Sequence, residues 1–280
     1  EWAGRNRNWL TGVFTLFVLV IAGLALAEIL RKVSLADIQI ALAKITWHQI
    51  GLSVALCALS YFVLTGYDVL ALRAIGKPQR YLRAALGSFT AYCFSHNLGF
   101  APITGAAARW RAYRGTNITP SDIARIVVLA GVTFWLGIFV LLGFFLVSFP
   151  GALRLEHGRF SFDPPFAVQA AIGAIILLGA AVYLWTCWQQ SGPLRILGWT
   201  LPVPSLKQAL AQYALAATDI AIASAALLVL LPPETWHQYP DFIVAYVVAI
   251  VVALLTHAPG GLGVFEAVIL VTMPEVQKPE

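Results

Sequence analysis

The chain of 280 residues is too hydrophobic and too poor in charge for a soluble domain. Hydrophobic residues make up 60% of it, charged residues 11%, and its mean hydropathy is +0.80, whereas a soluble domain carries about 25% charged residues. The formal net charge of +5 does not indicate nucleic-acid binding, because no basic and aromatic module is present and membrane proteins collect Lys and Arg in cytoplasmic loops. The composition predicts an all-α, polytopic transmembrane helical bundle.

Apolar runs long enough to cross a hydrocarbon core of roughly 30 Å recur along the chain. The candidate membrane segments are 10–30, 49–75, 84–103, 121–149, 166–188, 205–231, 240–257 and 261–273. The first is too long and uniform for a signal peptide. Residues 34–45 have apolar side chains on one helical face, which predicts an amphipathic helix in the interface. Further along, Thr119-Pro120-Ser121-Asp122 is a capping box with Pro at the first helical position, so a helix should begin there.

The loops indicate the orientation of these segments. Arg5 and Arg7 precede the first segment and place the N-terminus in the cytoplasm. The 73–83 loop is basic and should be cytoplasmic, while the 232–240 loop lacks Lys and Arg and should be external. Both ends of 84–117 then fall on the cytoplasmic side. This segment is therefore predicted to enter as a helix, break around residues 95–102, and return as a second short helix.

The later part of the chain repeats the order of the earlier part. The first unit has a helix with an acidic residue, an apolar arm and a break, marked by Asp68, His96, Pro102 and Gly105. The second has the same order and a short returning arm, marked by Asp219, His257, Pro259, Gly260, Gly261 and Glu266. The two Asp-bearing helices should run in opposite directions. The pattern predicts an inverted-topology repeat, with units of about 49–149 and 205–273 and two broken or re-entrant helix pairs.

Three acidic residues are the sharpest functional signal. A charged side chain at the centre of a bilayer costs about 2.5–3.5 kcal/mol on insertion scales, so Asp68, Asp219 and Glu266 should face a cavity or a partner. Asp219 lies about midway along its predicted helix, and Asp68 lies nearer an end. They are candidates to bind an ammonium group. The alternative is structural: a pair with Arg73, Arg109 or Arg111, or a protonated acid bonded to a neighbouring helix.

Arg109 and Arg111 come shortly after the predicted break at Gly105. Unpaired N–H groups and the positive dipole end of a helix N-terminus attract phosphate, and arginine adds a bidentate donor pair. Both are candidates to bind a lipid phosphate, and the alternative is that they are ordinary basic residues of the cytoplasmic side. His96 and His257 are interpreted as caps for freed carbonyls. The proline and glycines of the breaks allow unwound backbone where it lines a cavity.

Covalent catalysis and metal binding have no visible machinery in the sequence. No HExxH, GxSxG or P-loop motif is present, and Cys57, Cys93 and Cys187 lack metal-ligand spacing. We therefore expect no metal, no cofactor and no catalytic residue in these 280 residues. Carboxylates for ammonium and arginines for phosphate instead favour a zwitterionic or cationic phospholipid headgroup as the ligand, and hence lipid translocation.

Two stretches resemble a known family. They are Pro102-Ile103-Thr104-Gly105-Ala106-Ala107-Ala108-Arg109, followed by Arg111-Ala112-Tyr113, and His257-Ala258-Pro259-Gly260-Gly261-Leu262-Gly263-Val264-Phe265-Glu266. With their surroundings they are similar to the flippase domain of the multiple peptide resistance factor family, the bacterial aminoacyl-phosphatidylglycerol synthase/flippases. The resemblance covers essentially the whole chain. It assigns the family's acidic and arginine positions to Asp68, Arg109, Asp219 and Glu266.

The resemblance implies a role in the bacterial cytoplasmic membrane. The domain would move lysyl- or alanyl-phosphatidylglycerol from the inner to the outer leaflet, which gives resistance to cationic antimicrobial peptides. It also implies a C-terminal synthase domain beyond residue 280, a phosphatidylglycerol lysyltransferase that uses aminoacyl-tRNA. Phosphatidylglycerol and its aminoacyl form, that synthase domain and a second copy of the chain are the expected partners. The alternatives are a membrane anchor or docking scaffold for the synthase, and, less favoured, an intramembrane enzyme.

Overall fold

The computed structural model describes residues 35–98, 101–149, 151–153, 155–157, 160–189, 194–196, 199–201, 203–256, 261 and 263–273. Its helices are α2 (Leu35–Lys44), α3 (Trp47–Ala74), α4 (Tyr81–Leu98), α5 (Ala101–Ala112), α6 (Pro120–Ser148), α7 (Phe166–Trp188), α8 (Leu206–Leu228), a 3₁₀ helix (Pro233–Gln238), α9 (Tyr239–Thr256) and α10 (Val264–Thr272). Five helices in the described ranges are long and apolar enough to cross a membrane: α3, α6, α7, α8, and α9 with the 3₁₀ helix that precedes it. The predicted polytopic helical bundle is confirmed.

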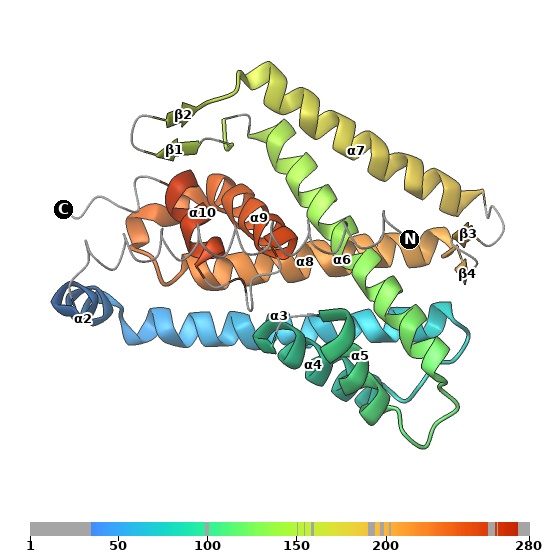
Figure 1. Ribbon diagram of the computed structural model, residues 1–280. Helices are drawn as coiled ribbons and strands as arrows, with labels where there is room; N and C mark the ends of the chain where they lie inside the picture. The colour runs from blue at the N-terminus through green and yellow to red at the C-terminus, as the bar shows by residue number, and fades with distance from the viewer. Residues whose placement is uncertain are drawn as a thin grey trace, which may run out of the picture.

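The centre of the bundle is an antiparallel pair of long helices, α3 and α8 (Figure 1). At the start of α3, the Gln49 side-chain amide donates to the carbonyl of Val229, just after α8, at 3.0 Å. Halfway along, the Ser60 hydroxyl donates to the carboxylate of Asp219 at 2.6 Å. The beginning of one helix therefore lies beside the end of the other. Hydrogen bonds between polar side chains join helices where lipid supplies no hydrophobic drive.

The first helix hairpin, α4 and α5, enters and leaves at the C-terminal end of α3. The 75–80 loop is short, so α4 begins beside the end of α3. The chain returns to the same place after α5, because the Lys77 ammonium donates to the Asn117 carbonyl at 3.0 Å and pairs with the Asp122 carboxylate at 2.6 Å. Both ends of the hairpin lie on one side, as predicted for a re-entrant pair.

The second hairpin, α9 and α10, lies at the opposite end of the central pair. Met273, directly after α10, packs in one buried cluster with Leu228 at the end of α8 and Phe242 at the start of α9. Both ends of this hairpin therefore lie beside the C-terminal end of α8, which is the N-terminal end of α3. The units α3–α4–α5 and α8–α9–α10 have the same order and opposite directions (Figure 1). This is the inverted arrangement that the sequence predicts.

Helices α6 and α7 cover one side of the central pair (Figure 1). The Gln212 amide of α8 donates to the Thr133 hydroxyl of α6 at 2.9 Å and accepts from the Tyr183 hydroxyl of α7 at 3.0 Å. The face of α7 away from α6 and α8 is apolar and exposed, as a lipid-facing surface should be; its exposed side chains include Phe166, Val168, Ile172, Ile175, Leu178 and Val182. Its outer surface fits the acyl-chain region of a bilayer.

Two short antiparallel hairpins flank α7. The strands Leu155–His157 (β1) and Phe160–Phe162 (β2) pair before it, and Leu194–Ile196 (β3) and Trp199–Leu201 (β4) pair after it. The sequence analysis did not predict them. They lie in the connections between spans, where strand pairing satisfies backbone groups without affecting the all-α character of the bundle.

Several local predictions are confirmed. Helix α6 begins with the predicted capping box: Thr119 is the N-cap, Pro120 is the first helical residue, and the Asp122 carboxylate accepts from the Thr119 N–H at 2.8 Å. The expected interfacial helix is present as α2. The expected break in 84–117 falls between Leu98 and Ala101. The first candidate segment, 10–30, lies outside the described residues.

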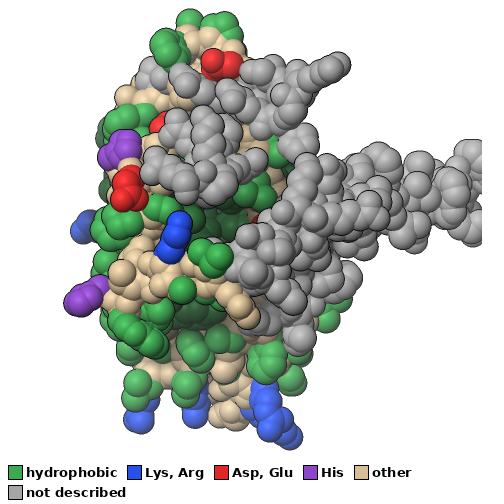
Figure 2. Space-filling view, turned by 90° about the vertical axis from the view of Figure 1, so that its left-hand side faces the viewer, with side chains coloured by type: hydrophobic (Ala, Val, Ile, Leu, Met, Phe, Trp, Pro, Cys, Tyr) green, Lys and Arg blue, Asp and Glu red, His purple; other side chains and the backbone are tan. Residues whose placement is uncertain are grey.

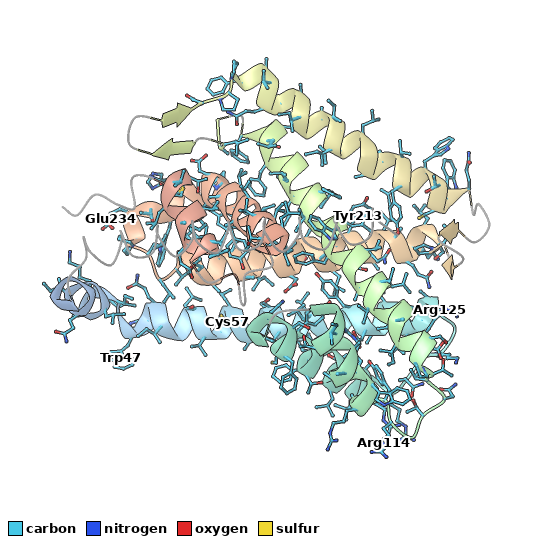
Figure 3. The ribbon with its side chains drawn as sticks, viewed as in Figure 1. Trp47, Cys57, Arg114, Arg125, Tyr213 and Glu234 are labelled. Atoms are coloured by element: carbon cyan, nitrogen blue, oxygen red, sulfur yellow. The ribbon has the colours of Figure 1, made fainter. Side chains whose placement is uncertain are left out.

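The charges of the bundle are asymmetric between its two ends. Arg114 and Arg125 lie at one end, and Trp47 and Glu234 lie at the other (Figure 3). The face of the molecule on the side of Glu234 shows many hydrophobic side chains, and Lys and Arg side chains gather along the bottom of that view (Figure 2). By the positive-inside rule, the end with Arg114 should face the cytoplasm.

This orientation has a direct test. In a variant without the native cysteines, Glu234→Cys should react with a membrane-impermeant maleimide in intact cells, and Arg114→Cys should react only after lysis. Both positions are exposed, so reagent access depends on the side of the membrane and not on burial. The opposite labelling pattern would invert the orientation, and labelling of both in intact cells would contradict the bundle's two-ended arrangement.

Candidate functional site

Two buried charged groups, Asp68 of α3 and Arg109 of α5, form an ion pair. Asp68 is 0% exposed and Arg109 is 4% exposed. The Arg109 guanidinium donates to the Asp68 carboxylate from Nε at 3.0 Å to each oxygen and from Nη2 at 2.7 Å to Oδ1. The fork of donors makes such a pair both strong and geometrically specific. The structural alternative for Asp68, a pair with Arg109, is therefore what the structure shows.

A tyrosine completes the coordination of this pair. The Tyr113 hydroxyl, from the residue directly after α5, donates to Oδ2 of Asp68 at 2.6 Å. Helix α4 leaves room for this hydroxyl at Gly87, where a Cβ atom would lie 2.6 Å from the Tyr113 oxygen. The glycine thus permits a close approach that any larger residue would obstruct. Asp68 is consequently held by charge and hydrogen bonds from the returning arm of the first hairpin.

Asp219 has a different environment. It is 6% exposed near the middle of α8, and its carboxylate accepts hydrogen bonds from the Ser60 hydroxyl at 2.6 Å and the Tyr67 hydroxyl at 3.2 Å. Both donors come from α3 and both are neutral. Among the ion pairs of the described residues, none includes Asp219. Two of the three acids predicted from the sequence, Asp68 and Asp219, are therefore buried, and of these two only Asp68 has a cationic partner among the described residues.

Aromatic contacts join the two carboxylates into one network. Tyr67 is the residue before Asp68, and its ring meets the Tyr92 ring of α4 edge to face with centroids 5.6 Å apart. The Arg109 guanidinium lies over the same Tyr92 ring at 5.4 Å, a cation–π distance. His96 lies beside Tyr92 at 5.7 Å between ring centroids. The network thus connects α3, α4, α5 and α8.

The position of Arg109 and Arg111 corrects one prediction. Helix α5 begins at Ala101, so both arginines lie in its last turn, not at its N-terminus. The helix starts earlier than expected because Pro102 is well accommodated in a first turn, and Gly105 is an internal residue rather than a break. The dipole at this end is negative and favours the arginines themselves. The predicted position of the two arginines at the N-terminus of this helix is therefore wrong, and Arg111 is exposed.

Some of the remaining predicted residues lie apart from the network, and the others are not among the residues that the structure describes. Glu266 is exposed at the start of α10, where its carboxylate accepts the N–H of Gly263 at 2.8 Å. Gly261 has φ +70°, a conformation that glycine tolerates. The other residues predicted at the second break, His257, Pro259 and Gly260, are not among the described residues.

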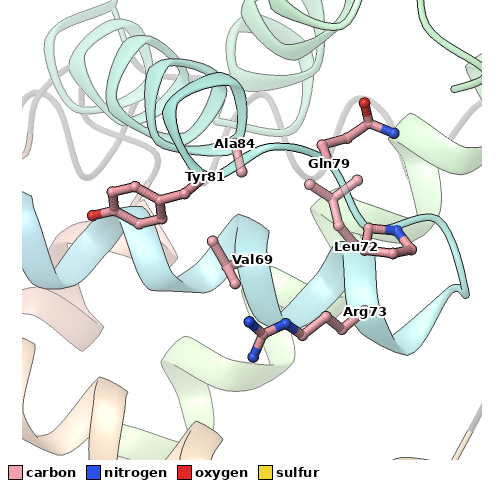
Figure 4. Close-up of a pocket in the computed structure, with 7 residues that line it drawn as sticks. Val69, Leu72, Arg73, Gln79, Tyr81 and Ala84 are labelled. Atoms are coloured by element: carbon pink, nitrogen blue, oxygen red, sulfur yellow. The ribbon is translucent and has the colours of Figure 1, made fainter.

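A cavity lies at the C-terminal end of α3, beyond Asp68 (Figure 4). It has a volume of about 150 Å³, and its lining residues are Val69, Leu72, Arg73, Pro78, Gln79, Tyr81 and Ala84. Arg73 and Tyr81 are exposed, so the cavity combines an apolar wall with a cationic group at the predicted cytoplasmic end. Such a combination suits the junction of a phospholipid headgroup and its glycerol.

Sequence reasoning missed the neutral members of the network: Ser60, Tyr67, Tyr92 and Tyr113. A hydroxyl carries no insertion cost comparable to that of a charge, so these residues do not stand out in an apolar run. A weak signal was available in α3. Gln49, Ser53, Ser60 and Tyr67 follow a spacing of four, seven and seven, which places them along one helical face, and that face is the one toward α8.

The comparisons with known proteins agree with a membrane protein. No family model matches the chain. It is 32% identical over 220 residues to an uncharacterized protein of Synechocystis sp., over 77% of this chain and 66% of that protein. It is 29% identical over 219 residues to the inner membrane protein YbhN of Escherichia coli, over 78% of this chain and 66% of YbhN. The match thus spans 66% of the length of each relative. The five apolar helices and these similarities show a multi-pass membrane protein that is similar to the inner membrane protein YbhN and to the Synechocystis protein.

Proposed function

We propose that this chain translocates aminoacylated phosphatidylglycerol from the inner to the outer leaflet of a bacterial cytoplasmic membrane. The observation that carries the proposal is the geometry of the hairpins. They enter from opposite ends of the α3–α8 pair, and the first brings Arg109 to a buried network that contains Asp68 and Asp219. Inverted repeats with broken helices can expose one central site to either side in turn. A lipid needs only such a path for its headgroup, because its acyl chains can stay in the bilayer.

The charges favour a headgroup that carries an ammonium group. Asp68 and Arg109 neutralise each other, so the Asp219 carboxylate is the part of the network that would attract a cation. At the predicted cytoplasmic end, the cavity beside Arg73 offers a cation for the lipid phosphate. Lysyl-phosphatidylglycerol carries ammonium and phosphate groups that fit these two places in succession. This division of roles differs from the one expected from sequence, in which Arg109 and Arg111 bind the phosphate.

The competing function is an anchor or docking scaffold for a lipid-modifying enzyme. It is favoured by one observation: in the described residues, every buried side-chain nitrogen and oxygen has a hydrogen-bond partner. A purely structural network would have the same property. The two functions differ in whether Asp219 affects the distribution of the lipid between the inner and outer leaflets.

Asp219→Asn tests the proposal. In a bacterium that synthesises lysyl-phosphatidylglycerol but lacks a flippase for it, the wild-type chain should raise the fraction of that lipid in the outer leaflet. The variant should reduce this gain by about tenfold or more, since loss of a buried charge partner costs about 2–5 kcal/mol of binding. The measurement is the reaction of the lysyl amine with a membrane-impermeant reagent in intact cells, relative to total lysyl-phosphatidylglycerol.

Glu234→Gln is the matched control, because it removes one carboxylate from an exposed position at the end of the bundle. It should leave outer-leaflet exposure unchanged. Equal exposure with the wild type, Asp219→Asn and an empty vector would refute translocation and favour the scaffold.

A further inference from the structure

Two buried carboxylates at related positions of the inverted repeat differ in what they can do. Asp68 faces Arg109, which has only N–H donors and keeps its charge. Every contact of this pair suits an ionised carboxylate. Asp219 faces two hydroxyl groups and, in the described part of the chain, no cation bonds to it. Asp68 is therefore held by a fixed cation, and Asp219 is held by neutral hydroxyl groups.

The hydroxyl partners of Asp219 can serve both protonation states. A serine or tyrosine hydroxyl donates one hydrogen bond and also accepts, and it rotates to suit its partner. When Asp219 is ionised, Ser60 and Tyr67 donate to its two oxygens, as observed. When Asp219 is protonated, its own O–H can donate to one of these hydroxyl oxygens while the other still donates. In each state both carboxyl oxygens of Asp219 keep a hydrogen-bond partner, so the gain or loss of a proton requires the rotation of a hydroxyl group rather than a movement of the helices.

The groups that face Asp219 from the neighbouring helices do not oppose this exchange. Four tyrosines of the described residues lie within electrostatic range of it: Tyr61 and Tyr67 on α3, Tyr92 on α4 and Tyr246 on α9. The Asp68–Arg109 ion pair of the same network has no net charge. A carboxyl group in such a neutral and poorly hydrated place gains stability from any cation that replaces water, either a proton or an ammonium group.

We propose that Asp219 is a proton-binding site, and that a proton and the ammonium group of the transported lipid exchange there. Protonated Asp219 is neutral, and the headgroup that arrives is a cation. After the exchange, the Asp219 carboxylate and the headgroup form a neutral ion pair and one proton is free, so the charge balances. At the outer side the reverse step releases the headgroup and takes up a proton. The site stays neutral in both halves of the cycle, so a proton moves inward for each lipid that moves outward. This proposal rests on the proposed function and adds that lipid translocation is coupled to the movement of a proton.

Infrared spectroscopy of the purified chain in lipid nanodiscs tests the proton site without transport. The wild-type protein should show a carbonyl band of a buried protonated carboxylic acid that disappears as the pH rises. Asp219→Asn should lack this band, and Glu234→Gln should keep it. Ser60→Ala removes a donor to the ionised form, so its band should persist to a pH about one unit higher. A band that survives in Asp219→Asn, or no titrating band in the wild type, would overturn the proton site.

The exchange is tested with two lipid probes in the same spectra. Short-chain lysyl-phosphatidylglycerol should abolish the band at a fixed pH, because its ammonium group displaces the proton. Phosphatidylglycerol of the same chain length lacks the ammonium group and should leave the band in place. If neither lipid changes the band, or both do, exchange at Asp219 is refuted.

Proteoliposomes separate failure of the coupling from failure of the proposed function. A gradient of one pH unit, acidic on the side that receives the lipid, should raise the translocation rate by up to about tenfold, since one proton accompanies each headgroup. An equal translocation rate with and without the gradient would refute proton coupling but would leave the proposed flippase activity in place. No translocation under either condition would refute the flippase, whereas the infrared titration would still decide the proton site.

Discussion

Arg109→Met should lower the free energy of unfolding by about 3–5 kcal/mol, because it leaves a buried carboxylate without its counter-charge. Asp68 is 0% exposed and would keep only the Tyr113 hydroxyl as a partner. The double variant Asp68→Leu with Arg109→Met replaces the pair by apolar side chains of similar volume and should recover most of this loss. Equilibrium unfolding of the detergent-solubilised protein measures all three proteins.

The second ion pair of the described chain provides the control. Lys77 and Asp122 pair at 2.6 Å at the end of the bundle, and the Lys77 side chain is 30% exposed. Lys77→Met should cost about 0–1 kcal/mol, as for other pairs that water can reach. If Arg109→Met and Lys77→Met were equally mild, the Asp68–Arg109 pair could not be the desolvated contact described above.

Gly137→Ala should destabilise the bundle by about 1–3 kcal/mol, the usual cost of overpacking. Gly137 is on α6 where this helix crosses α8, and an added Cβ would overlap the Ala216 side chain and lie 2.8 Å from the Ala216 carbonyl carbon. Backbone atoms cannot rotate away, so the two helices would have to separate. The predicted change is a lower unfolding midpoint in the same detergent titration.

Gly131→Ala is the matched control on the same helix. A Cβ there meets no atom within 4 Å, and alanine favours a helix over glycine by about 0.5–1 kcal/mol. This variant should be slightly more stable than the wild type. Similar effects of the two substitutions would mean that α6 does not approach α8 as closely as described.

The helices and their order could be predicted because each depends on local sequence. Apolar length defines the spans, and α7 coincides with the predicted segment 166–188. The Thr119 capping box marks the start of α6 from four adjacent residues. The opposite senses of the two Asp-bearing helices followed from loop charge alone. These features are encoded within one turn or one span, so no knowledge of tertiary contacts was needed.

The partners of the buried charges could not be predicted in the same way. Asp68 had three candidate arginines, and the choice of Arg109 depends on how the first hairpin folds back over a separation of 41 positions along the chain. The start of α5 was misplaced because Gly105 was interpreted as a helix break when Pro102 already opens the helix. Glu266 seemed equivalent to the two aspartates in sequence, but its position in the first turn of α10 makes it a capping group. Tertiary folding, not residue type, decides these roles.

The antiparallel course of α3 and α8 has a consequence for how the membrane potential acts on the protein. The dipoles of two helices that run in opposite directions oppose each other, and the Asp68–Arg109 pair carries no net charge. A voltage does work only on net charge, about 2.3 kcal/mol per elementary charge for each 100 mV. When Asp219 carries a proton or pairs with an ammonium group, as proposed, that site is neutral as well, so the electric field has little net charge to act on in this central frame.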